Sequence, residues 1–306
     1  AWVKKKGSEI FTLIDKEGNE IPTKGYKKVG YIIEGYDDRI AVYENGAMGW
    51  INRDGKVVIP CKYMGMSTFD KEFGLACVMP NEGEEEKYGF INKEGQLIIP
   101  YQFKQAGVSS FHNGVCRATV KGKTVMINEK GEVVFTSKFG SLQRLNQGLM
   151  AVPTGPNRTG WGFVNMQDEM VIPAEYDYVH EFNEDGIAVV EKKELSGLIN
   201  TKGEMVIPMK YATIWYDYTE DGYICCSYPT EEAMSLLKTK KDYYDINFNI
   251  VDMQGYTLMG ADGEELIPMM NADAKRGFMN RKYEVVIPAQ YAKATSFNGG
   301  YAFVSE

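Results

Sequence analysis

Groups that could perform acid, base or nucleophilic catalysis are scattered along this sequence. The two histidines, His112 and His180, sit at unrelated positions, and neither has a second ligand at the spacing of a metal site. The order of residues along the chain gives no support for a catalytic triad of serine, histidine and aspartate. It gives none for a catalytic pair of cysteine and histidine. Phosphate-binding and dinucleotide-binding glycine motifs are absent. The sequence therefore predicts no enzyme activity, no bound metal and no cofactor.

Carboxylates are abundant, with 42 Asp and Glu against 34 Lys and Arg. A pair of them could act as general acid and base, so a carboxylate-dependent hydrolase is a third hypothesis for function. The run from Glu84 to Glu86, however, is typical of a solvated loop. Calcium needs several oxygen ligands within about a dozen residues, whereas Asn52 to Asp54 leads at once into an apolar strand. We predict no calcium site.

Net charge and hydropathy exclude two further classes of partner. The formal net charge is −8 and the pI is near 5.1, so no basic surplus is present to neutralise phosphates. We expect no binding to nucleic acid. No apolar run approaches the roughly 18 residues that a membrane-spanning helix requires, and we expect no transmembrane segment.

The cysteines are predicted to be free, buried thiols. They are odd in number and share no equivalent position that would suggest a disulfide framework; they are Cys61, Cys77, Cys116, Cys225 and Cys226. Free thiols favour a reducing compartment, so the cytoplasm is slightly preferred. Ala1 to Val3 already matches the interior of a repeat unit, which fits both removal of a secretion leader and origin in a longer protein.

An unusual density of aromatic residues surrounds a long connection from Ser227 to Asn249. Pro229 and the acids after it are typical of a helix start, and lysines lie near the expected end, so a helical insertion is predicted at about 229–242. The aromatic residues are suited to gripping a peptide or stacking on a sugar, and they could equally cover the docking site of the helix. The candidate binding residues are Trp215, Tyr216, Tyr218, Tyr228, Tyr243 and Tyr244.

These residues belong to an internal repeat. One sequence motif recurs five times. Each copy contains a glycine, an apolar or aromatic residue, an asparagine and, toward its C-terminal end, an Ile-Pro pair. The copies are GWINRDGKVVIPCKY at 49–63, GFINKEGQLIIPYQF at 89–103, GFVNMQDEMVIPAEY at 162–176, GLINTKGEMVIPMKY at 197–211 and GFMNRKYEVVIPAQY at 277–291. The aligned Asn or Asp falls at Asp15, Asn52, Asn92, Asn128, Asn165, Asn200, Asp252 and Asn280, so eight units of about 38 residues are predicted.

Each unit is predicted to contain about three short strands. The Asn-x-x-Gly turn joins a glycine-aromatic strand to a β-branched strand, and its glycine, such as Gly95, is suited to a positive φ. Most of the β-branched strands stop at a proline, which lacks the N–H that a ladder needs. An aromatic residue three positions later is expected to plug the gap between neighbouring units; these residues are Tyr63, Phe103, Tyr176, Tyr211 and Tyr291. A small-residue strand precedes each hairpin.

The combined pattern resembles the WG repeat family of bacterial proteins, also called KWG repeats. The likeness covers nearly the whole chain. The Trp-Gly pair that names the family occurs here once, at Trp161-Gly162, while other units carry Met48-Gly49 or Tyr88-Gly89 in its place. The resemblance implies repeated β-hairpin modules and no established chemistry.

The fold predicted is all-β, a single domain over residues 1–306 built as an array of antiparallel hairpins. With three strands per unit, an open, twisted, solenoid-like array is favoured, and a closed propeller-like ring is the alternative. The connection between the small-residue strand and the glycine-aromatic strand varies most in length, so its edge is the candidate binding surface. We predict a non-enzymatic scaffold that holds a protein or peptide partner there, with a carbohydrate or cell-envelope binding module as the alternative.

Overall fold

The computed structural model describes residues 1–30, 39–65, 67–80, 87–104, 110–139, 141–155, 159–215, 223–229, 240–259 and 265–306. All regular elements in these ranges are β-strands, and all their pairings are antiparallel, which confirms the all-β prediction. Over the same ranges, no helix has the length and apolar character that crossing a bilayer requires. The chain divides into two compact units, unit 1 from Ala1 to Ala174 and unit 2 from Glu175 to Glu306.

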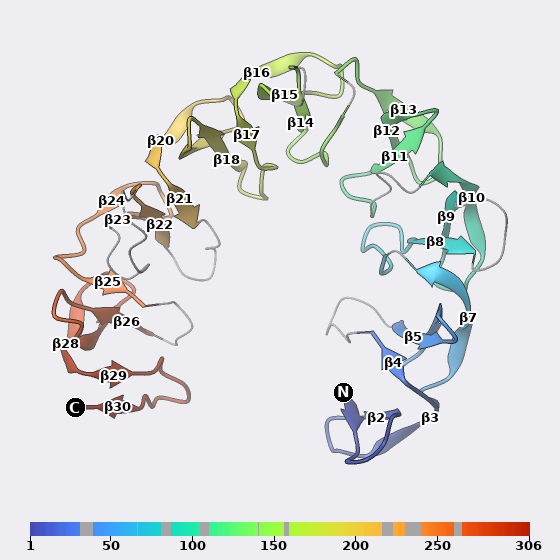
Figure 1. Ribbon diagram of the computed structural model, residues 1–306, viewed down its shortest axis with the longest axis horizontal. Coiled ribbons are helices and arrows are strands. Elements are labelled where there is room, and N and C mark those ends of the chain that lie inside the picture. Colours follow the sequence, from blue (N-terminus) through green and yellow to red (C-terminus); the bar gives the residue numbers. More distant parts are fainter. Residues whose placement is uncertain are drawn as a thin grey trace. The chain divides into compact units, whose positions relative to one another are not determined.

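Unit 1 contains a three-stranded sheet, a seven-stranded sheet and two further three-stranded sheets, each with strands in chain order (Figure 1). Its strands are β1 (Trp2–Lys4), β2 (Phe11–Ile14), β3 (Glu20–Tyr26), β4 (Lys28–Val29), β5 (Ile40–Glu44), β6 (Ala47–Ile51), β7 (Val57–Gly65), β8 (Ala76–Pro80), β9 (Lys87–Ile91), β10 (Leu97–Lys104), β11 (Cys116–Val120), β12 (Lys123–Ile127), β13 (Val133–Thr136), β14 (Met150–Pro153), β15 (Trp161–Val164) and β16 (Met170–Tyr176), the last of which continues just past the boundary.

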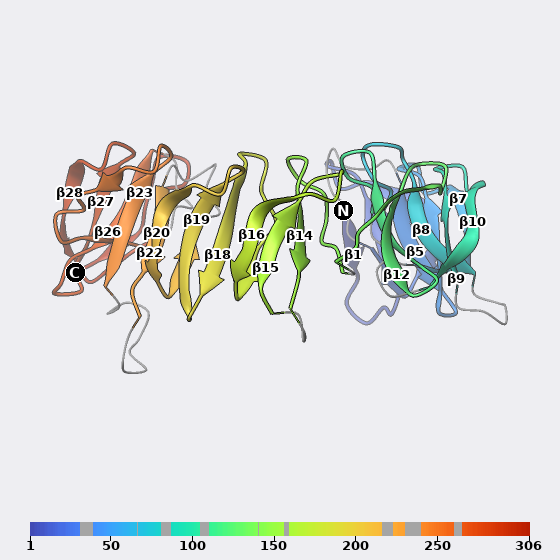
Figure 2. The same ribbon diagram turned by 90° about the horizontal axis from the view of Figure 1, so that it is seen from above.

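Unit 2 contains three four-stranded sheets and a final two-stranded hairpin. Its strands are β17 (Tyr178–Val179), β18 (Ile187–Lys192), β19 (Leu195–Asn200), β20 (Met205–Tyr211), β21 (Thr213–Trp215), β22 (Tyr223–Ser227), β23 (Lys241–Asp245), β24 (Ile250–Val251), β25 (Thr257–Leu258), β26 (Leu266–Met270), β27 (Arg276–Asn280), β28 (Val285–Tyr291), β29 (Lys293–Ala294) and β30 (Val304–Ser305). Figure 2 shows the strands of each sheet running side by side between two edges.

The four-stranded sheets correct the expected three strands per unit. A short first strand follows the plug aromatic and pairs with the small-residue strand, as β17 does with β18 through Tyr178 and Glu191. We number the strands of such a sheet first to fourth, so the small-residue strand is the second, the glycine-aromatic strand the third and the β-branched strand the fourth. The strand count that favoured the open array is therefore wrong for unit 2, and open array and closed ring both stay predictions.

The asparagine turn between the third and fourth strands forms as predicted. At Asn200 the backbone N–H donates to the Glu204 carbonyl at 3.0 Å, and the side-chain oxygen accepts the N–H groups of Lys202 and Glu204, each at 3.0 Å. One amide side chain thus satisfies two turn donors. Gly203 takes a φ of +82° and Gly95 a φ of +80°, which confirms the conformation predicted for the turn glycines.

One aligned position in unit 2 was predicted wrongly. The residue that makes this turn after β23 is Asp245, not Asp252: the Asp245 N–H donates to the Asn249 carbonyl, and its carboxylate accepts the N–H groups of Asn247 and Asn249. Asp252 lies seven residues later, beyond the fourth strand β24. The error arose because the segment around Asp245 contains neither the turn glycine nor the Ile-Pro pair by which the other units were aligned.

The plug aromatics lie in the apolar interior, as predicted. Four of them are buried, namely Tyr63, Phe103, Tyr176 and Tyr211, whereas Tyr291 is half-buried. Tyr211 packs with Leu198 of its own sheet and with Ile224 and Tyr244 of the following sheet. Face-to-face packing of successive sheets, visible for unit 2 in Figure 1, therefore builds the core, and the aromatic ring joins the two faces.

In every four-stranded sheet the connections lie at the two ends of the strands, and we call each of these two ends an edge. The asparagine turn lies at one of them, which we call the turn edge. The connection from the second to the third strand lies at the other, together with the end of the fourth strand, and we call this the loop edge. In sheet β21–β24 the register places Ser227 opposite Lys241 at the loop edge and Tyr223 opposite Asp245 at the turn edge. In each four-stranded sheet of unit 2 the second strand thus ends and the third begins at the loop edge, as expected.

Candidate functional site

The predicted helical insertion at 229–242 is corrected at its end. Residues 230–239 lie outside the described residues, as do the candidate binding residues Tyr216 and Tyr218. Lys241 and Asp242 belong to strand β23, not to a helix. They pair with Ser227 and Cys226 of β22, so the ladder resumes immediately after the connection. The acidic, lysine-rich composition hid this strand from sequence reasoning.

Two of the candidate aromatics meet in a polar group at the loop edge of unit 2, which we call the Asp242 cluster. Its centre is the Asp242 carboxylate, which accepts hydrogen bonds from the hydroxyls of Tyr211 at 2.6 Å and Tyr228 at 2.7 Å. The Lys210 ammonium lies 3.2 Å from the same oxygen and 3.0 Å from the Tyr228 hydroxyl. The hydroxyl of Tyr244 completes the cluster, 2.6 Å from that of Tyr211. Three elements, β20, β23 and the end of β22, meet here.

Electrostatics fix the charge state of this cluster. Burial by itself would raise the pKa of Asp242, but the hydrogen bonds from Tyr211, Tyr228 and Lys210 outweigh it and hold the pKa below its ordinary value. The pKa of Lys210 is raised, first by the hydrogen bond with Tyr228 and further by the one with Asp242, although burial acts in the opposite direction. Burial, followed by the hydrogen bond with Asp242, raises the pKa of Tyr211. At neutral pH the cluster is an ion pair of Lys210 and Asp242, in which the Tyr228 hydroxyl bonds to both charged groups and the Tyr211 hydroxyl donates to Asp242.

The remaining described candidates lie elsewhere. Strand geometry places alternate residues of β23 on opposite faces, so Tyr244 faces sheet β17–β20 while Tyr243 faces sheet β25–β28. Tyr243 is buried, and its hydroxyl accepts the Leu258 N–H at 3.1 Å. Trp215 lies on β21 with 45% of its surface exposed. The structure thus divides the predicted aromatic group between two faces of one sheet and its short first strand.

A pocket opens on the Tyr243 side of β23, and a departure from the repeat explains it. In β20 the seventh and eighth residues after the turn asparagine are Ile207, fully buried, and Pro208. The equivalent positions after Asp245 are Asp252 and Met253. Because Asp252 is exposed and cannot occupy the core, pairing stops after Val251, and β24 has 2 residues where β20 has 7. The chain leaves the sheet there.

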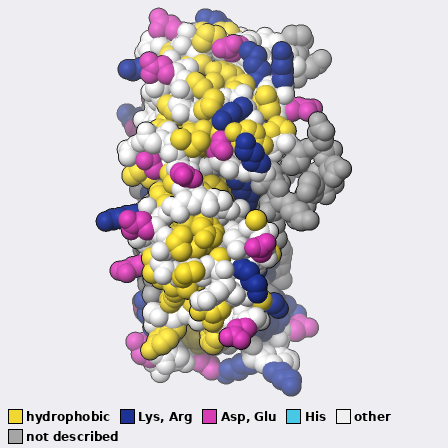
Figure 3. All heavy atoms as spheres, turned by 90° about the vertical axis from the view of Figure 1, so that its left-hand side faces the viewer, with side chains coloured by type: hydrophobic (Ala, Val, Ile, Leu, Met, Phe, Trp, Pro, Cys, Tyr) yellow, Lys and Arg dark blue, Asp and Glu magenta, His cyan; other side chains and the backbone are white. Residues whose placement is uncertain are grey.

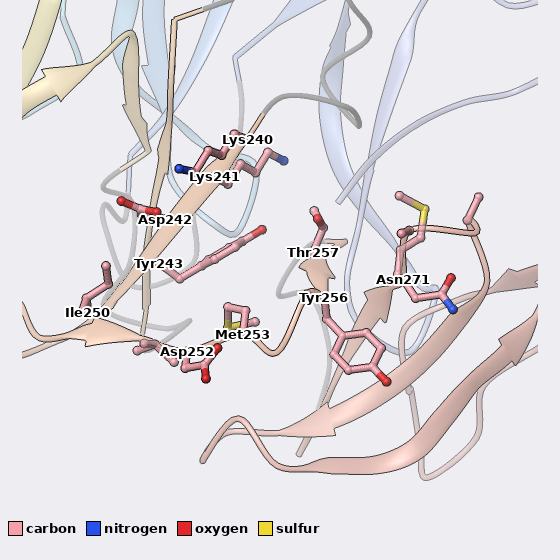
Figure 4. A pocket seen from close by; sticks show the side chains of 15 residues that line it. Lys240, Lys241, Asp242, Tyr243, Ile250, Asp252, Met253, Tyr256, Thr257 and Asn271 are labelled. Carbon is pink, nitrogen blue, oxygen red and sulfur yellow. The ribbon is translucent and has the colours of Figure 1, made fainter.

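The resulting pocket, which we call the β23 pocket, is open to solvent and has a volume of about 950 Å³ (Figure 4). Figure 4 shows Tyr243 pointing across it toward Thr257, with Met253 beneath the ring. Lys240 and Lys241 line it at the loop edge, and Asn271 lines it from the turn between β26 and β27. Tyr256 stands eleven residues after Asp245, the spacing of a plug tyrosine, but is half-buried and lines the pocket instead.

The family assignment follows from the repeat itself. A model described as "WG containing repeat" matches residues 48–82, 88–123, 161–195, 197–225 and 277–306, which together exceed half of the chain. The chain belongs to the WG repeat family. The segment between the last two matches contains the described strands β23 to β26 and therefore most of the β23 pocket. The pocket lies where this WG repeat protein departs from the pattern of its own family.

Comparison with solved structures finds similar chains of low sequence identity. A crystal structure of a eukaryotic initiation factor is similar over 93% of this chain and 84% of its own, with a TM-score of 0.54 and 12% sequence identity. The structure of Kluyveromyces lactis Hsv2p matches 84% of this chain and 95% of its own, with a TM-score of 0.44 and 9% identity. No curated protein sequence matches the WG repeat chain significantly.

The histidines and cysteines, which were also considered for chemistry, lie in surroundings typical of residues with a structural role. The ring of His112 lies 2.6 Å from the side-chain oxygen of Asn146, and His180 lies 3.6 Å from the Glu191 carboxylate with 54% of its side chain exposed. All five cysteines are free. Burial raises the pKa of the Cys226 thiol to about 12, which makes it a poor nucleophile at neutral pH. In the described part of the chain, no cluster of three or more potential metal ligands occurs.

Sequence reasoning missed Lys210, Asp242 and Met253 as parts of the site. Two signals were present in the sequence. Asp252-Met253 stands where the repeat places Ile-Pro, at the seventh and eighth positions after the turn residue, and Tyr256 keeps the spacing of the plug. Once Asp245 is taken as the turn residue, both signals fall in one unit, and a defect in packing where Asp252-Met253 replaces Ile-Pro follows.

Proposed function

We propose that this protein is a non-enzymatic binding module that holds a protein or peptide partner at the loop edge of unit 2. The observation that carries the proposal is the β23 pocket, which opens where Asp252-Met253 replaces Ile-Pro. An open pocket in which apolar side chains such as Met253 and Tyr256 lie beside polar ones such as Asp252 and Asn271 is typical of a ligand-binding site. Its location on the edge that carries the variable connections agrees with the expected position of a binding surface.

A binding role is favoured over catalysis by the state of the acidic groups. Asp242, the most enclosed carboxylate of the site, already accepts hydrogen bonds from three donors, and its pKa is lowered. A carboxylate in that state is a weak general base and does not carry a proton to donate near neutral pH. These properties support positioning of neighbouring side chains rather than the acid and base pair of a hydrolase.

A protein partner is favoured over a carbohydrate by the burial of the repeated aromatic rings. Stacking on a sugar needs accessible ring faces at regular intervals, whereas Tyr63, Phe103, Tyr176 and Tyr211 are buried in the core. Apolar side chains are exposed instead. Figure 3 shows them gathered on the side of unit 2 that carries the fourth strands, where Met205, Ile250 and Val286 are each more than 40% exposed.

Site-specific photo-crosslinking tests this proposal. The full chain, with benzoylphenylalanine in place of Tyr256, is illuminated in lysate of its host, and crosslinked proteins are identified by mass spectrometry. We expect one or a few proteins that are absent when the same group replaces Tyr301, which is 82% exposed and does not line the pocket. Identical capture from both positions, or strong binding on a glycan array with no captured protein, would contradict the proposal.

A further inference from the structure

Strand β23 has a backbone position whose hydrogen-bonding groups are not directed at β22. The Tyr228 N–H donates to the Lys240 carbonyl at 3.0 Å, and Asp242 pairs with Cys226, so the backbone groups of residues 240 and 242 point toward β22. Consecutive residues of an antiparallel strand direct these groups to opposite sides. The N–H and C=O of Lys241 therefore point away from β22, toward the side of β23 that carries β24.

On that side β24 does not reach Lys241. Its last residue, Val251, pairs with Tyr243, which lies two residues further along β23. Beyond Val251 the chain leaves the sheet and lines the pocket with Asp252 and Met253. Among the described residues no strand pairs with Lys241 on this side, so one N–H and one C=O face the open pocket.

The other hairpins show what fills the equivalent position. Lys241 stands four residues before the turn residue Asp245, and in five other hairpins the residue with this spacing pairs with an aromatic residue of the strand after the turn. The pairs are Phe11 with Tyr26, Met48 with Tyr63, Tyr88 with Phe103, Ser196 with Tyr211 and Arg276 with Tyr291. An aromatic residue in an extended segment is therefore the natural neighbour of this backbone position.

In sheet β21–β24 the aromatic residue with the plug spacing does not take this place. Tyr256 is half-buried, lines the pocket and forms no strand pair with Lys241. The place for a ring lies beside Tyr243. Tyr243 stands two residues before its turn residue, as Leu198 does, and Leu198 is the residue of its own sheet on which the Tyr211 ring packs. The backbone position and the place for the ring are both open on the same side of β23.

The lining of the pocket suits an uncharged aromatic side chain. The pocket is continuous with the apolar interface in which Tyr243 and Met253 pack against sheet β25–β28. Met270 and Tyr256 extend this lining, and both methionine sulfur and aromatic rings make favourable contacts with a further ring. Two lysines and two aspartates also line the pocket, so their formal charges cancel and do not select a charged occupant.

We propose that the β23 pocket binds an extended segment of the partner protein, which pairs with the backbone of Lys241 and places an aromatic side chain beside Tyr243. The partner supplies from another chain the aromatic residue that the other hairpins supply from their own following strand. This rests on the proposed function and adds the conformation and the side chain that the partner must present. Backbone pairing contributes affinity, and the pocket contributes selectivity for the side chain.

Selection from a peptide library, followed by direct measurement, tests this inference. The full chain is used to select from random peptides of about ten residues, and we expect enrichment of Phe, Tyr or Trp at one position. The selected peptide is labelled with a fluorophore, and its affinity is measured by fluorescence polarisation. Replacing its aromatic residue by alanine should weaken binding about tenfold or more, since burial of a large apolar side chain is lost.

Methylation of the peptide backbone tests the strand pairing without altering the protein. The same peptide is synthesised with an N-methyl group on its aromatic residue, which removes the N–H that donates to the Lys241 carbonyl. We expect binding to weaken about three- to tenfold, the range for loss of one hydrogen bond. N-methylation of the terminal residue farthest from the aromatic residue is the control and should change affinity by less than about twofold.

A matched pair of chain variants separates the backbone of Lys241 from its charge. Lys241→Pro removes the N–H that faces the pocket and leaves the pairing with β22, which residues 240 and 242 make. It should weaken the peptide about tenfold, because the peptide carbonyl loses its donor and the proline ring occupies its place. Lys241→Gln retains the N–H and should change affinity by less than about threefold. Circular dichroism checks folding, and the methylated peptide keeps the test decisive if Lys241→Pro does not fold.

Four outcomes would overturn this inference. They are selection of no peptide, enrichment of peptides without an aromatic residue, equal affinity of the methylated and unmethylated peptides, and an effect of Lys241→Gln as large as that of Lys241→Pro, which would mean that charge decides binding. Failure of the proposed function has a different signature, because no protein is then captured from position 256 in lysate. If a partner is captured there and Lys241→Pro leaves its capture unchanged, the pocket is an interface but the partner does not pair with β23.

Discussion

The glycine that gives the family half of its name is required by a close approach of two strands. A Cβ placed on Gly162 would lie 2.5 Å from the Ile172 carbonyl oxygen, and one placed on Gly49 would lie 2.5 Å from the Ile59 carbonyl oxygen. In both cases the obstacle is the backbone of the fourth strand, next to its Ile-Pro pair, where the ladder shifts register. A side chain could be accommodated only if the strand moved. The tryptophan of the pair, by contrast, is replaced in most units.

Replacement of Gly162 by alanine should therefore destabilise unit 1. We expect a loss of about 1–3 kcal/mol, the usual cost of overpacking a close-packed region. The comparison variant is Gly148→Ala, which has a φ of +75° but open space around its Cβ, so it incurs only the backbone penalty. Urea unfolding measures both. A smaller effect for Gly162→Ala than for Gly148→Ala would show that the strand yields easily.

Asp242 is the residue at which stability should depend on pH. Its pKa in the folded chain is below the ordinary value of 3.8, so its charge contributes stability that is fully present above about pH 4 and is lost as pH falls through the folded pKa. Asp242→Asn should lower stability by about 1–3 kcal/mol at pH 7, the range for hydrogen bonds to a charged group. The difference from wild type should shrink below pH 4.

Thermal unfolding between pH 3 and pH 7 measures this difference. Glu194→Gln, at an exposed position of unit 2, is the control for removal of one negative charge. A difference between wild type and Asp242→Asn that stays constant down to pH 3 would mean that the carboxylate is not held in its charged form by Tyr211, Tyr228 and Lys210.

At the scale of the element, the fourth strand determines whether a sheet closes against its neighbour. Where it carries Ile-Pro, as in β20, the isoleucine is buried and the proline removes an N–H from an exposed strand edge. The proline thereby discourages pairing with another chain on a side where apolar residues such as Met205 are exposed. Strand β24 lacks the Ile-Pro pair, and its shortness opens the β23 pocket. A single element thus links a change of motif to a candidate site.

Two substitutions should restore the missing pattern. Asp252→Ile with Met253→Pro would make residues 250–256 read Ile-Val-Ile-Pro-Gln-Gly-Tyr, with Tyr256 already at the plug position. We expect the fourth strand to lengthen, the isoleucine to become buried and stability to rise by about 1–2 kcal/mol, since burying such a side chain contributes that order. Binding of the partner at the β23 pocket should be weakened because the pocket fills.

Thermal unfolding and photo-crosslinking from position 256 check the two effects separately. The single variant Asp252→Ser serves as the control, since it removes the charge and adds no apolar side chain. A double variant with unchanged melting temperature and unchanged crosslinking to the partner would refute the idea that the departure from Ile-Pro creates the pocket.

At the scale of the whole molecule, the apolar core is a series of clusters rather than one interior. Ile99 and Phe103 belong to one such cluster, inside unit 1, while Leu198, Tyr211 and Tyr244 belong to another, inside unit 2. Stability in such an array depends on contacts between neighbouring sheets. Unfolding of the full chain should accordingly not be a single all-or-none transition.

Removal of one core side chain should act locally for this reason. Leu198→Ala, at a fully buried position, should destabilise the surrounding sheets by about 2–5 kcal/mol. Hydrogen exchange followed by mass spectrometry should show faster exchange across β17 to β24, with unit 1 unchanged. Uniformly faster exchange over the whole chain would instead indicate that the two units unfold together.

The sequence by itself determined the features that depend on short stretches of chain. The hairpins, the asparagine turns, the positive φ of Gly95 and the burial of Phe103 follow from residues within about a dozen positions of one another, because turn chemistry and side-chain alternation are local. Membership of the WG repeat family was evident from the same phrases. The repeat alignment around Asp245 was predicted wrongly because this segment lacks the turn glycine and the Ile-Pro pair of the other units.

The tertiary structure decided which distant residues form a site. Lys210 and Asp242 are 32 residues apart, on strands of two different sheets, and their contact depends on how those sheets stack. Tyr243 and Tyr244 are neighbours in sequence yet face opposite sides of β23, a consequence of strand register that depends on where pairing resumes after a long connection. The β23 pocket arises from the absence of packing atoms beside β24, and local sequence preference does not encode a space left between sheets.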